Sequence, residues 1–359
     1  MGEIAGRGQA QRKRFFTTLE GLRGAAAILV LFRHITSYID PFSFQMSYLA
    51  VDLFFILSGT VIANAYEKSL LSGAMSFKEF ATLRVARIFP LYLFGSAIGL
   101  AAMALNGSAG GANMTLFAAL ALVMLPSPIV GLPLFPLNHP AWSLLFEFFA
   151  NFCYGKYVRR LPNRTLAGLV ALSFLLLLAG AALNGLSLDL GWTRRTLAFG
   201  FFRVLFSFGL GVLLYRAALP RLDGSLRLGP VSATVILAVS VLVLTAPVGK
   251  AIEPYCCVAA LAVIFPALVF LSMFVTLPGS FESAFRFLGE LSFPLYALHA
   301  PLYALSHALL GAQLDPLAPY SGLAFAFFAI AVSFSVHLWI DVPFRRALRG
   351  GILKRFASQ

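Results

Sequence analysis

The chain has 359 residues, of which 60% are apolar and 11% charged, and its mean hydropathy is +0.87. This composition excludes a soluble globular domain and is typical of a multi-pass membrane protein. The formal charge of +13 does not indicate nucleic acid as a partner, because the basic residues lie in short clusters between apolar segments, where they would face the anionic head groups of a lipid bilayer.

The first residues, 1–19, contain no apolar core followed by a small-residue cleavage site, so we expect a cytoplasmic tail and not a signal peptide. Residues 20–343 are expected to form a single all-α transmembrane domain, followed by a basic cytoplasmic tail at 344–359. A bilayer core ~30 Å thick needs roughly 20 apolar residues per helix. The chain therefore has room for about ten crossings and for no separate soluble domain.

Eleven apolar segments are candidates for these crossings. They lie at 22–38, 48–66, 87–105, 114–131, 141–158, 165–183, 196–217, 229–247, 252–277, 288–310 and 320–340. Basic clusters indicate cytoplasmic loops, so an even number of crossings must separate Arg87 from Lys156. Segment 114–131, which runs into a proline-rich stretch, is therefore expected to be re-entrant or to lie on the outer surface. Ten crossings remain, with both termini in the cytoplasm.

The first segment, within the stretch EGLRGAAAILVLFRHIT, carries Arg23 and His34 eleven residues apart, about three turns or ~16 Å along one helix face. With the N-terminus inside, Arg23 lies at the inner end and His34 in the outer half of the membrane, where an ionisable side chain needs partners or water. His34 is a candidate general base. A neutral imidazole that only packs between helices explains it equally well.

Two carboxylates are expected near the depth of His34. Asp52 begins the second segment, and Glu147 lies in the fifth segment after Trp142 and Ser143. A histidine base is usually oriented by a carboxylate, so we expect Glu147 or Asp52 beside His34. Glu147 is favoured, because Asp52 could simply cap a helix or face water, whereas Glu147 lies among phenylalanines.

The third segment begins with Arg84 and Arg87, three residues apart on one helix face at its inner end. Two guanidinium groups so placed suit a phosphate-bearing ligand that arrives from the cytoplasm. Taken alone, the pair is explained more simply as an ordinary cytoplasmic cluster.

The tenth segment places Ser292, Tyr296 and His299 on one helix face, spaced by four and three residues. This polar stripe could line a tunnel or hydrogen-bond to a neighbouring helix. The remaining histidines are expected to have structural or interfacial roles; they are His139, His307 and His337.

The last segment ends in the sequence DVPFRRALR. Asp341 could pair there with an inner arginine, and Pro343 is expected to end the crossing. The cysteines lie in apolar stretches without metal-ligand spacing, so we expect no disulfide, no metal site and no permanently bound cofactor; they are Cys153, Cys256 and Cys257.

Taken in order, these motifs resemble the membrane acyltransferase-3 family. The strongest is LEGLRGAAAILVLFRH, with an arginine, ten residues and a histidine; VDLFFILSG, RVARIFPLY, WSLLFEFF, LGELSFPLYALHAPL and a terminal acidic-x-Pro element follow. The resemblance covers nearly the whole chain. Members of this family move acyl groups, commonly acetyl, from cytoplasmic acyl-CoA to sugar hydroxyls on the other side of the membrane.

The resemblance implies that His34 is the essential histidine, that Arg23 is its first-helix companion, and that Arg84 and Arg87 bind the donor. Glu147 corresponds to the acidic position after Trp-Ser. It also implies acetyl-CoA as the donor substrate, a carbohydrate or glycolipid as the acceptor, and the inner membrane of a bacterium as the location.

Three positions depart from the family pattern without removing a reactive group. Glu20 stands where Asp is commoner, Thr60 replaces a bulky residue after Ser-Gly, and Asp341 replaces Glu before Pro343. Many relatives carry an additional extracytoplasmic hydrolase-like domain. This chain is expected to act alone or with a separate extracytoplasmic partner protein.

In the expected mechanism, His34 removes the proton of a sugar hydroxyl as it attacks the thioester, or is itself acylated first. Ser143 or Tyr296 would donate to the developing oxyanion, and Trp142 and His299 would help to line the substrate path. The alternative is a proton-coupled transporter or flippase for a glycan or small molecule, because buried Arg, His and Glu also form transport pathways. Consumption of acyl-CoA distinguishes the two.

Overall fold

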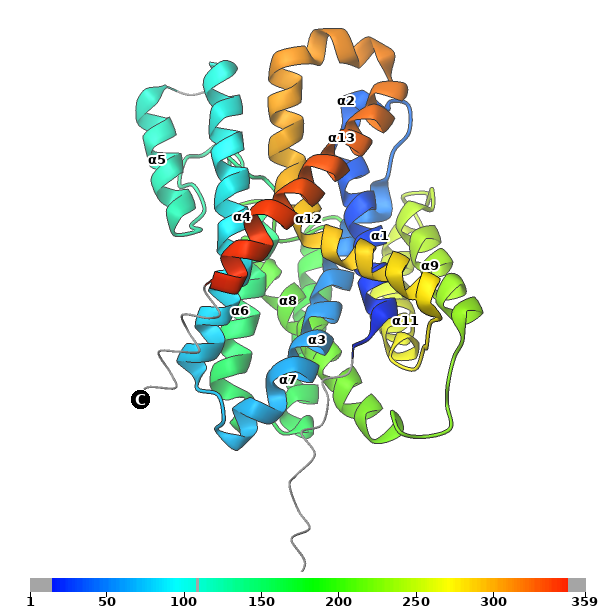
Figure 1. The fold of residues 1–359 in the computed structure, drawn as a ribbon. Helices are drawn as coiled ribbons and strands as arrows, with labels where there is room; N and C mark the ends of the chain where they lie inside the picture. The colour runs from blue at the N-terminus through cyan, green and yellow to red at the C-terminus, as the bar shows by residue number, and fades with distance from the viewer. Residues whose placement is uncertain (1–14, 108–109, 348–359) are drawn as a thin grey trace, which may run out of the picture.

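The computed structural model describes residues 15–107 and 110–347 (Figure 1). Within these residues the fold is helical, and the one β-type contact is an isolated bridge between Leu228 and Val275. The α-helices are α1 (Thr17–His34), α2 (Thr36–Ile39), α3 (Ala50–Ser72), α4 (Phe77–Leu105), α5 (Gly111–Leu122), α6 (Ala141–Tyr157), α7 (Asn163–Leu183), α8 (Leu197–Ala218), α9 (Pro230–Thr245), α10 (Glu253–Ala259), α11 (Phe265–Ser272), α12 (Gly279–Leu314) and α13 (Tyr320–Val336). Short 3-10 helices are η1 (Gln45–Leu49), η2 (Val158–Arg160), η3 (Leu219–Arg221) and η5 (Asp315–Leu317), and π-helical turns are η4 (Ala260–Ile264) and η6 (His337–Asp341).

The predicted all-α class is confirmed, and each of the eleven apolar segments overlaps a helix. Six helical stretches of the described residues are long and apolar enough to cross a membrane; they are Gln45–Ser72, Phe77–Leu105, Asn163–Leu183, Leu197–Arg221, Glu253–Ser272 and Tyr320–Ala347. The chain is therefore a multi-pass membrane protein. The count of ten crossings and the sidedness of the termini stay predictions.

Helix α5 occupies the segment that was expected not to cross. Its 12 residues extend only ~18 Å at 1.5 Å per residue, which is shorter than a bilayer core of ~30 Å. Residues 123–140 after it form no further helix. α5 is thus too short to span the membrane by itself, and its re-entrant or surface placement stays a prediction.

The predicted ends of the transmembrane domain differ slightly from the observed helices. α1 begins at Thr17, so the last three residues of the expected N-terminal tail are helical. At the other end the helix continues past Pro343 to Ala347, contrary to expectation. The π-helical turn at His337–Asp341 widens the helix just before Pro343, which lets the ring fit without ending the helix. The rest of both predicted tails lies outside the described residues.

Two close helix pairs form the centre of the bundle. α1 packs along α12, and α3 packs along α8. The second pair is very close, because a Cβ on Gly211 of α8 would lie only 2.0 Å from the carbonyl oxygen of Ile56 in α3. Thr60 stabilises the same crossing, because its Oγ1 donates to the carbonyl oxygen of Gly211 at 3.0 Å. Small residues at such crossings allow membrane helices to approach closely.

Helix α12 is bent, and its two parts contact different neighbours (Figure 1). It contains Pro294 and Pro301, and proline removes one helix hydrogen bond and bends the chain. Pro301 leaves the carbonyl oxygen of Ala297 without its usual amide donor. Asn138, in the segment before α6, replaces that donor with its Nδ2 at 3.0 Å. The bend is therefore supported by a side chain from another part of the fold.

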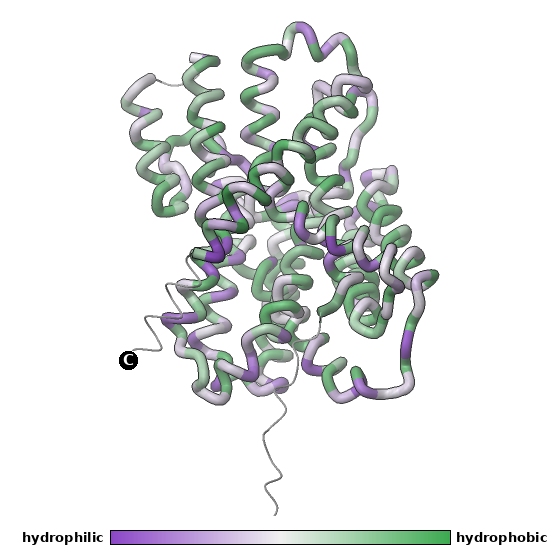
Figure 2. The backbone as a smooth tube through the Cα atoms, in the orientation of Figure 1, coloured by the Kyte–Doolittle hydropathy of each residue, from purple (hydrophilic) through white to green (hydrophobic). Residues whose placement is uncertain are grey.

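Figure 2 shows hydrophobic residues along most of the helical surface. Hydrophilic residues gather in the loops at the top and bottom of the view and again across the middle, where helices cross. Polar side chains inside an apolar bundle are costly unless they have partners. The buried polar residues in the middle of the bundle are therefore candidates for function.

Candidate functional site

Most of the predicted site residues in the described part of the chain line one of two cavities. The first, the His34 cavity, has a volume of about 380 Å³ and is lined by Arg33, His34, His139, Trp142, Asp189 and Trp192, among others. The second, the Arg84 cavity, has a volume of about 220 Å³ and is lined by Arg23, Ser58, Arg84, Arg87, Glu147 and Ser292, among others. Val51 and Tyr296 line both cavities. The two spaces therefore meet at these two side chains.

His34, the last residue of α1, lies beside His299 of α12. Nδ1 of His34 is 2.8 Å from the carbonyl oxygen of Val30, and Nδ1 of His299 is 3.0 Å from that of Leu295. Because a carbonyl only accepts, both rings carry their proton on Nδ1. Nε2 of His299 then faces the Nδ1–H of His34 at 3.3 Å as an acceptor. Nε2 of His34 is left unprotonated and able to accept a proton.

Each of the two carboxylates that we expected beside His34 is bound to an arginine instead. Oε1 of Glu147 accepts from Arg84 at 3.1 Å and from Ser58 at 2.9 Å, so Glu147 belongs to the Arg84 cavity. Asp52 is fully buried against Arg203. The expected pairing of His34 with Glu147 or Asp52 was wrong. A carboxylate in an apolar bundle gains more from a guanidinium than from a neutral imidazole.

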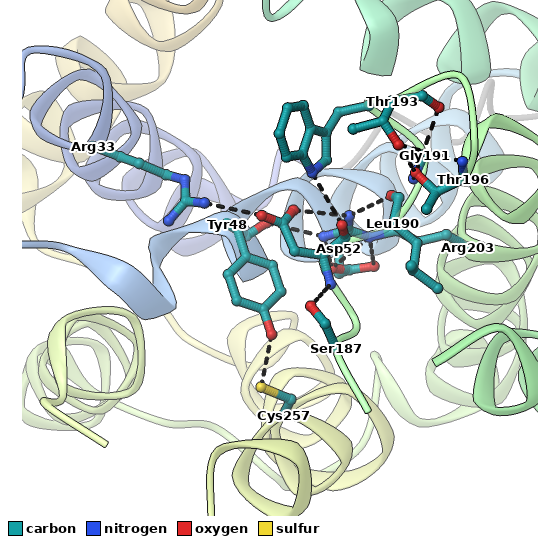
Figure 3. Close-up of polar contacts among 12 residues, drawn as sticks. Arg33, Tyr48, Asp52, Ser187, Leu190, Gly191, Thr193, Thr196, Arg203 and Cys257 are labelled. Atoms are coloured by element: carbon teal, nitrogen blue, oxygen red, sulfur yellow. Dashed lines mark hydrogen bonds and ion pairs between the residues drawn. The ribbon is translucent and has the colours of Figure 1, made fainter. Parts of the chain in front are cut away.

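Arg203 of α8 is the centre of a buried polar network (Figure 3). Its Nε and Nη2 donate to the carboxylate of Asp52 at 2.6–3.0 Å. Nη2 also donates to the carbonyl oxygen of Tyr48 at 3.0 Å, and Nη1 donates to that of Leu190 at 2.9 Å. One guanidinium thus joins α3, η1, α8 and the loop between α7 and α8. A buried charge is tolerated when each of its nitrogens has an acceptor in this way.

The Arg84 cavity gathers arginines from two helices. Arg84 and Arg87 line it from α4, as predicted from their shared face, and Arg23 lines it from α1. Arg84 is paired with Glu147, and Arg23 is paired with Glu20 and donates to Ser292 at 2.7 Å. Among the described residues Arg87 forms no ion pair. Its charge is therefore available to an anionic ligand.

Tyr296 lies where the two cavities meet. Its hydroxyl is 2.5 Å from the hydroxyl of Ser143 and donates to the carbonyl oxygen of Pro140 at 3.2 Å. Of the two interpretations of the stripe on α12, the structure shows the interhelical one, because Ser292, Tyr296 and His299 hydrogen-bond to α1 or α6. Ser292 and Tyr296 also line a cavity, and their place in a tunnel stays a prediction. Trp142 and Ser143 lie in the first turn of α6, next to this contact.

Several site residues escaped the sequence reasoning. His139, for which we expected a structural or interfacial role, lines the His34 cavity with its ring centroid 6.2 Å from that of His34. Asp189 lies in the α7–α8 loop and pairs with Arg33 at 3.0 Å. Arg203 could have been found, because a single arginine within the apolar stretch GFFRVLFSFG needs a buried partner. Nothing in the local sequence marks His139 or Asp189.

The other two histidines lie outside both cavities. His307 pairs with Asp315 at 3.3 Å on the partly exposed end of α12. His337 is 3.0 Å from Asp341, which also pairs with Arg345, so the expected pairing of Asp341 with an arginine is confirmed. Both histidines thus have the structural surroundings that the sequence predicted.

Comparisons with known proteins give the family. The chain is 34% identical over 185 residues to "Protein 2 in picA locus" of Rhizobium radiobacter, an alignment that covers 46% of this chain and 95% of that protein. No solved structure matches the chain. The family model described as an acyltransferase domain matches residues 16–339, which include every cavity residue named above. The chain therefore belongs to the membrane acyltransferase-3 family.

Proposed function

We propose that the protein is a membrane O-acyltransferase that moves an acyl group, acetyl in this proposal, from cytoplasmic acyl-CoA to a hydroxyl of an extracytoplasmic carbohydrate or glycolipid. The observation that carries the proposal is the meeting of two unlike cavities at Tyr296. One holds arginines and the other holds an imidazole with a free nitrogen. A phosphate-rich donor needs cations, and a hydroxyl nucleophile needs a base.

The donor would enter the Arg84 cavity. Arg87 would contact a CoA phosphate directly, because its charge has no carboxylate partner among the described residues. Arg84 would act as a second cation whose position is fixed by Glu147 and Ser58. The pantetheine arm would then extend towards Tyr296 and bring the thioester to the His34 cavity.

The transfer itself would take place beside His34. Nε2 of His34 would take the proton of the acceptor hydroxyl as its oxygen attacks the thioester carbon, and the C–S bond would then break. The imidazolium would return the proton to the leaving thiolate, which gives the acyl ester and free CoA thiol. The hydroxyl of Tyr296 or Ser143 would donate to the oxyanion of the tetrahedral intermediate. If the acyl group passes through an acyl-histidine, the same nitrogen would carry it.

His299 would take the role that a carboxylate has beside the histidine base of other enzymes. Its Nε2 faces Nδ1–H of His34, so it would orient the ring and stabilise the positive charge that forms on it. The whole reaction would take place in the inner membrane of a bacterium, with the lipid bilayer, acyl-CoA and the acceptor glycan as partners. A separate extracytoplasmic partner protein belongs to the same proposal.

The test is release of free thiol from acetyl-CoA by the purified protein in nanodiscs, with a glycan acceptor supplied. We expect His34→Ala to abolish release, and Arg84→Ala combined with Arg87→Ala to raise the KM for acetyl-CoA. Matched controls are His307→Ala and Arg286→Ala, because both side chains are partly exposed and lie outside the cavities. Near-normal release by His34→Ala would overturn the mechanism.

A transporter would use the same two cavities differently. It would bind its substrate and move it across the bilayer unchanged, so no thiol would appear with any acyl-CoA. Uptake of a labelled glycan into proteoliposomes without thiol release would therefore favour the transporter over the acyltransferase.

A further inference from the structure

The His34 cavity combines a charged pair, hydroxyls and aromatic rings around one space. Its volume of about 380 Å³ lies near the lower end of the range for small-molecule sites, ~300–1,000 Å³, so it suits a single small ligand. The aromatic residues come from separate elements, with Phe44 before η1, Trp142 in α6 and Trp192 in the α7–α8 loop. This mixture is typical of a site for a molecule that has both polar edges and apolar faces.

The charges in this cavity already balance one another. Nη2 of Arg33 donates to Oδ2 of Asp189 at 3.0 Å, and Nη1 donates to the carbonyl oxygen of Gln45 at 2.7 Å. Oδ1 of Asp189 lies 3.8 Å from Arg203. An anionic ligand would meet the carboxylate of Asp189, and a cationic one would meet the guanidinium of Arg33. A neutral ligand with hydroxyl groups avoids both penalties, because a hydroxyl can donate to Asp189 and accept from Arg33.

Trp192 provides a fixed aromatic face at this cavity. Its side chain is 39% exposed, yet its indole N–H donates to the carbonyl oxygen of Asp189 at 3.0 Å and so holds the ring in place. The ring centroid lies 5.8 Å from that of His139, which in turn lies 6.2 Å from that of His34. A ligand packed on Trp192 would thus lie along a row of rings that ends at the base.

The loop that carries Asp189 and Trp192 is held by the buried network (Figure 3). Arg203 donates to the carbonyl oxygen of Leu190, and Thr196 Oγ1 accepts from the amide of Gly191 at 3.1 Å. Gly191 has φ +105°, a conformation that favours glycine and lets the loop turn back onto α8. The loop is therefore ordered before any ligand binds, which reduces the entropy lost on binding.

We propose that the His34 cavity is the acceptor site and that it selects an uncharged glycosyl unit, which packs a ring face on Trp192 and hydrogen-bonds to Arg33 and Asp189. The proposal rests on the proposed acyl transfer and adds the charge class of the acceptor. A sugar ring has C–H groups on its faces and hydroxyls around its edge, which match the indole and the charged pair. A hydroxyl that points away from Trp192 would then face Nε2 of His34.

The test is a binding titration followed by intrinsic tryptophan fluorescence. The probes are methyl glucoside, methyl galactoside and methyl mannoside, with methyl glucuronide as the anionic counterpart. We expect at least one neutral glycoside to change the emission, and the change to persist in Trp339→Phe, whose indole lies on η6 away from the cavity. Trp192→Ala and Asp189→Asn should each weaken binding by about tenfold or more, which corresponds to ~1.4 kcal/mol.

The outcomes separate this proposal from the function on which it rests. No binding of any neutral glycoside, tighter binding of the glucuronide, or unchanged affinity in Trp192→Ala would overturn the acceptor assignment, even if the protein turns over acetyl-CoA. Glycoside binding that depends on Trp192, in a protein that releases no thiol from any acyl-CoA, would support the sugar site and reject the acyltransferase.

Discussion

At the scale of single residues, the chemistry of the site depends on which ionisable side chains are bound to one another within the protein. Glu147 and Asp52 are held by Arg84 and Arg203, so neither is available to the imidazole of His34. The remaining partner of that imidazole is another imidazole, on α12. In the proposed mechanism His299 takes the place of the carboxylate that a histidine base usually has, and it adds no buried negative charge.

His299→Gln tests this arrangement. Glutamine can still fill space between α1 and α12, but it cannot stabilise an imidazolium as well as the Nε2 lone pair of His299 does. We expect kcat of thiol release to fall about 10- to 100-fold with the KM for acetyl-CoA unchanged, within the range of acid–base contributions. His307→Gln on the same helix is the control. A change in KM alone would show that His299 contributes to donor binding instead.

At the scale of elements, helix α12 is the part of the fold that joins the two cavities. Ser292 lines the Arg84 cavity, and Tyr296, one turn later, lines both cavities where they meet. His299 then reaches His34. The bend between Pro294 and Pro301 aims these side chains at three different partners, which a straight helix with one polar face would not do.

A double-mutant cycle tests how this bend is held. Asn138→Ala leaves the carbonyl oxygen of Ala297 buried without a donor, so we expect it to lower the free energy of unfolding by about 1–3 kcal/mol. In a Pro301→Ala background the amide of residue 301 can donate to that carbonyl, so the cost of Asn138→Ala should become much smaller. Thermal unfolding of the four proteins in detergent measures the difference. Equal costs in both backgrounds would contradict the role given to Asn138.

At the scale of the whole molecule, the sequence predicted the elements better than their contacts. Apolar segments are set by the lipid environment, so their length and spacing predicted where the apolar helices lie. The pattern of basic residues, and not the segment's length, predicted that the segment of α5 does not cross, and α5 itself is only 12 residues long. The partners of the buried charges depend on how helices rotate and tilt against one another. From its depth in the membrane we expected Asp52 to lie near His34. The packing of α3 on α8 brings its carboxylate against Arg203 instead, and depth alone does not predict this contact.

The same limit applies to the loop between α7 and α8. Its residues Asp189 and Trp192 have no periodicity and no motif, and they join the site because Arg203 and Arg33 hold the loop against α1 and α8. The family motifs include His34, Arg84 and the start of α6, all of which line a cavity, and the roles expected for them stay predictions. They contained no information on the loop.

The proposed direction of transfer requires the two cavities to open on opposite sides of the membrane. Phe42, beside the His34 cavity, and Ala74, in the loop between α3 and α4, are both exposed. In a chain whose native cysteines are replaced by alanine, we expect Phe42→Cys to react with a membrane-impermeant maleimide in intact cells. Ala74→Cys should react only after permeabilisation, because the neighbouring basic residues Lys68 and Lys78 favour the cytoplasm. Labelling of both in intact cells would reject the sidedness, since donor and acceptor would then reach the protein from one compartment.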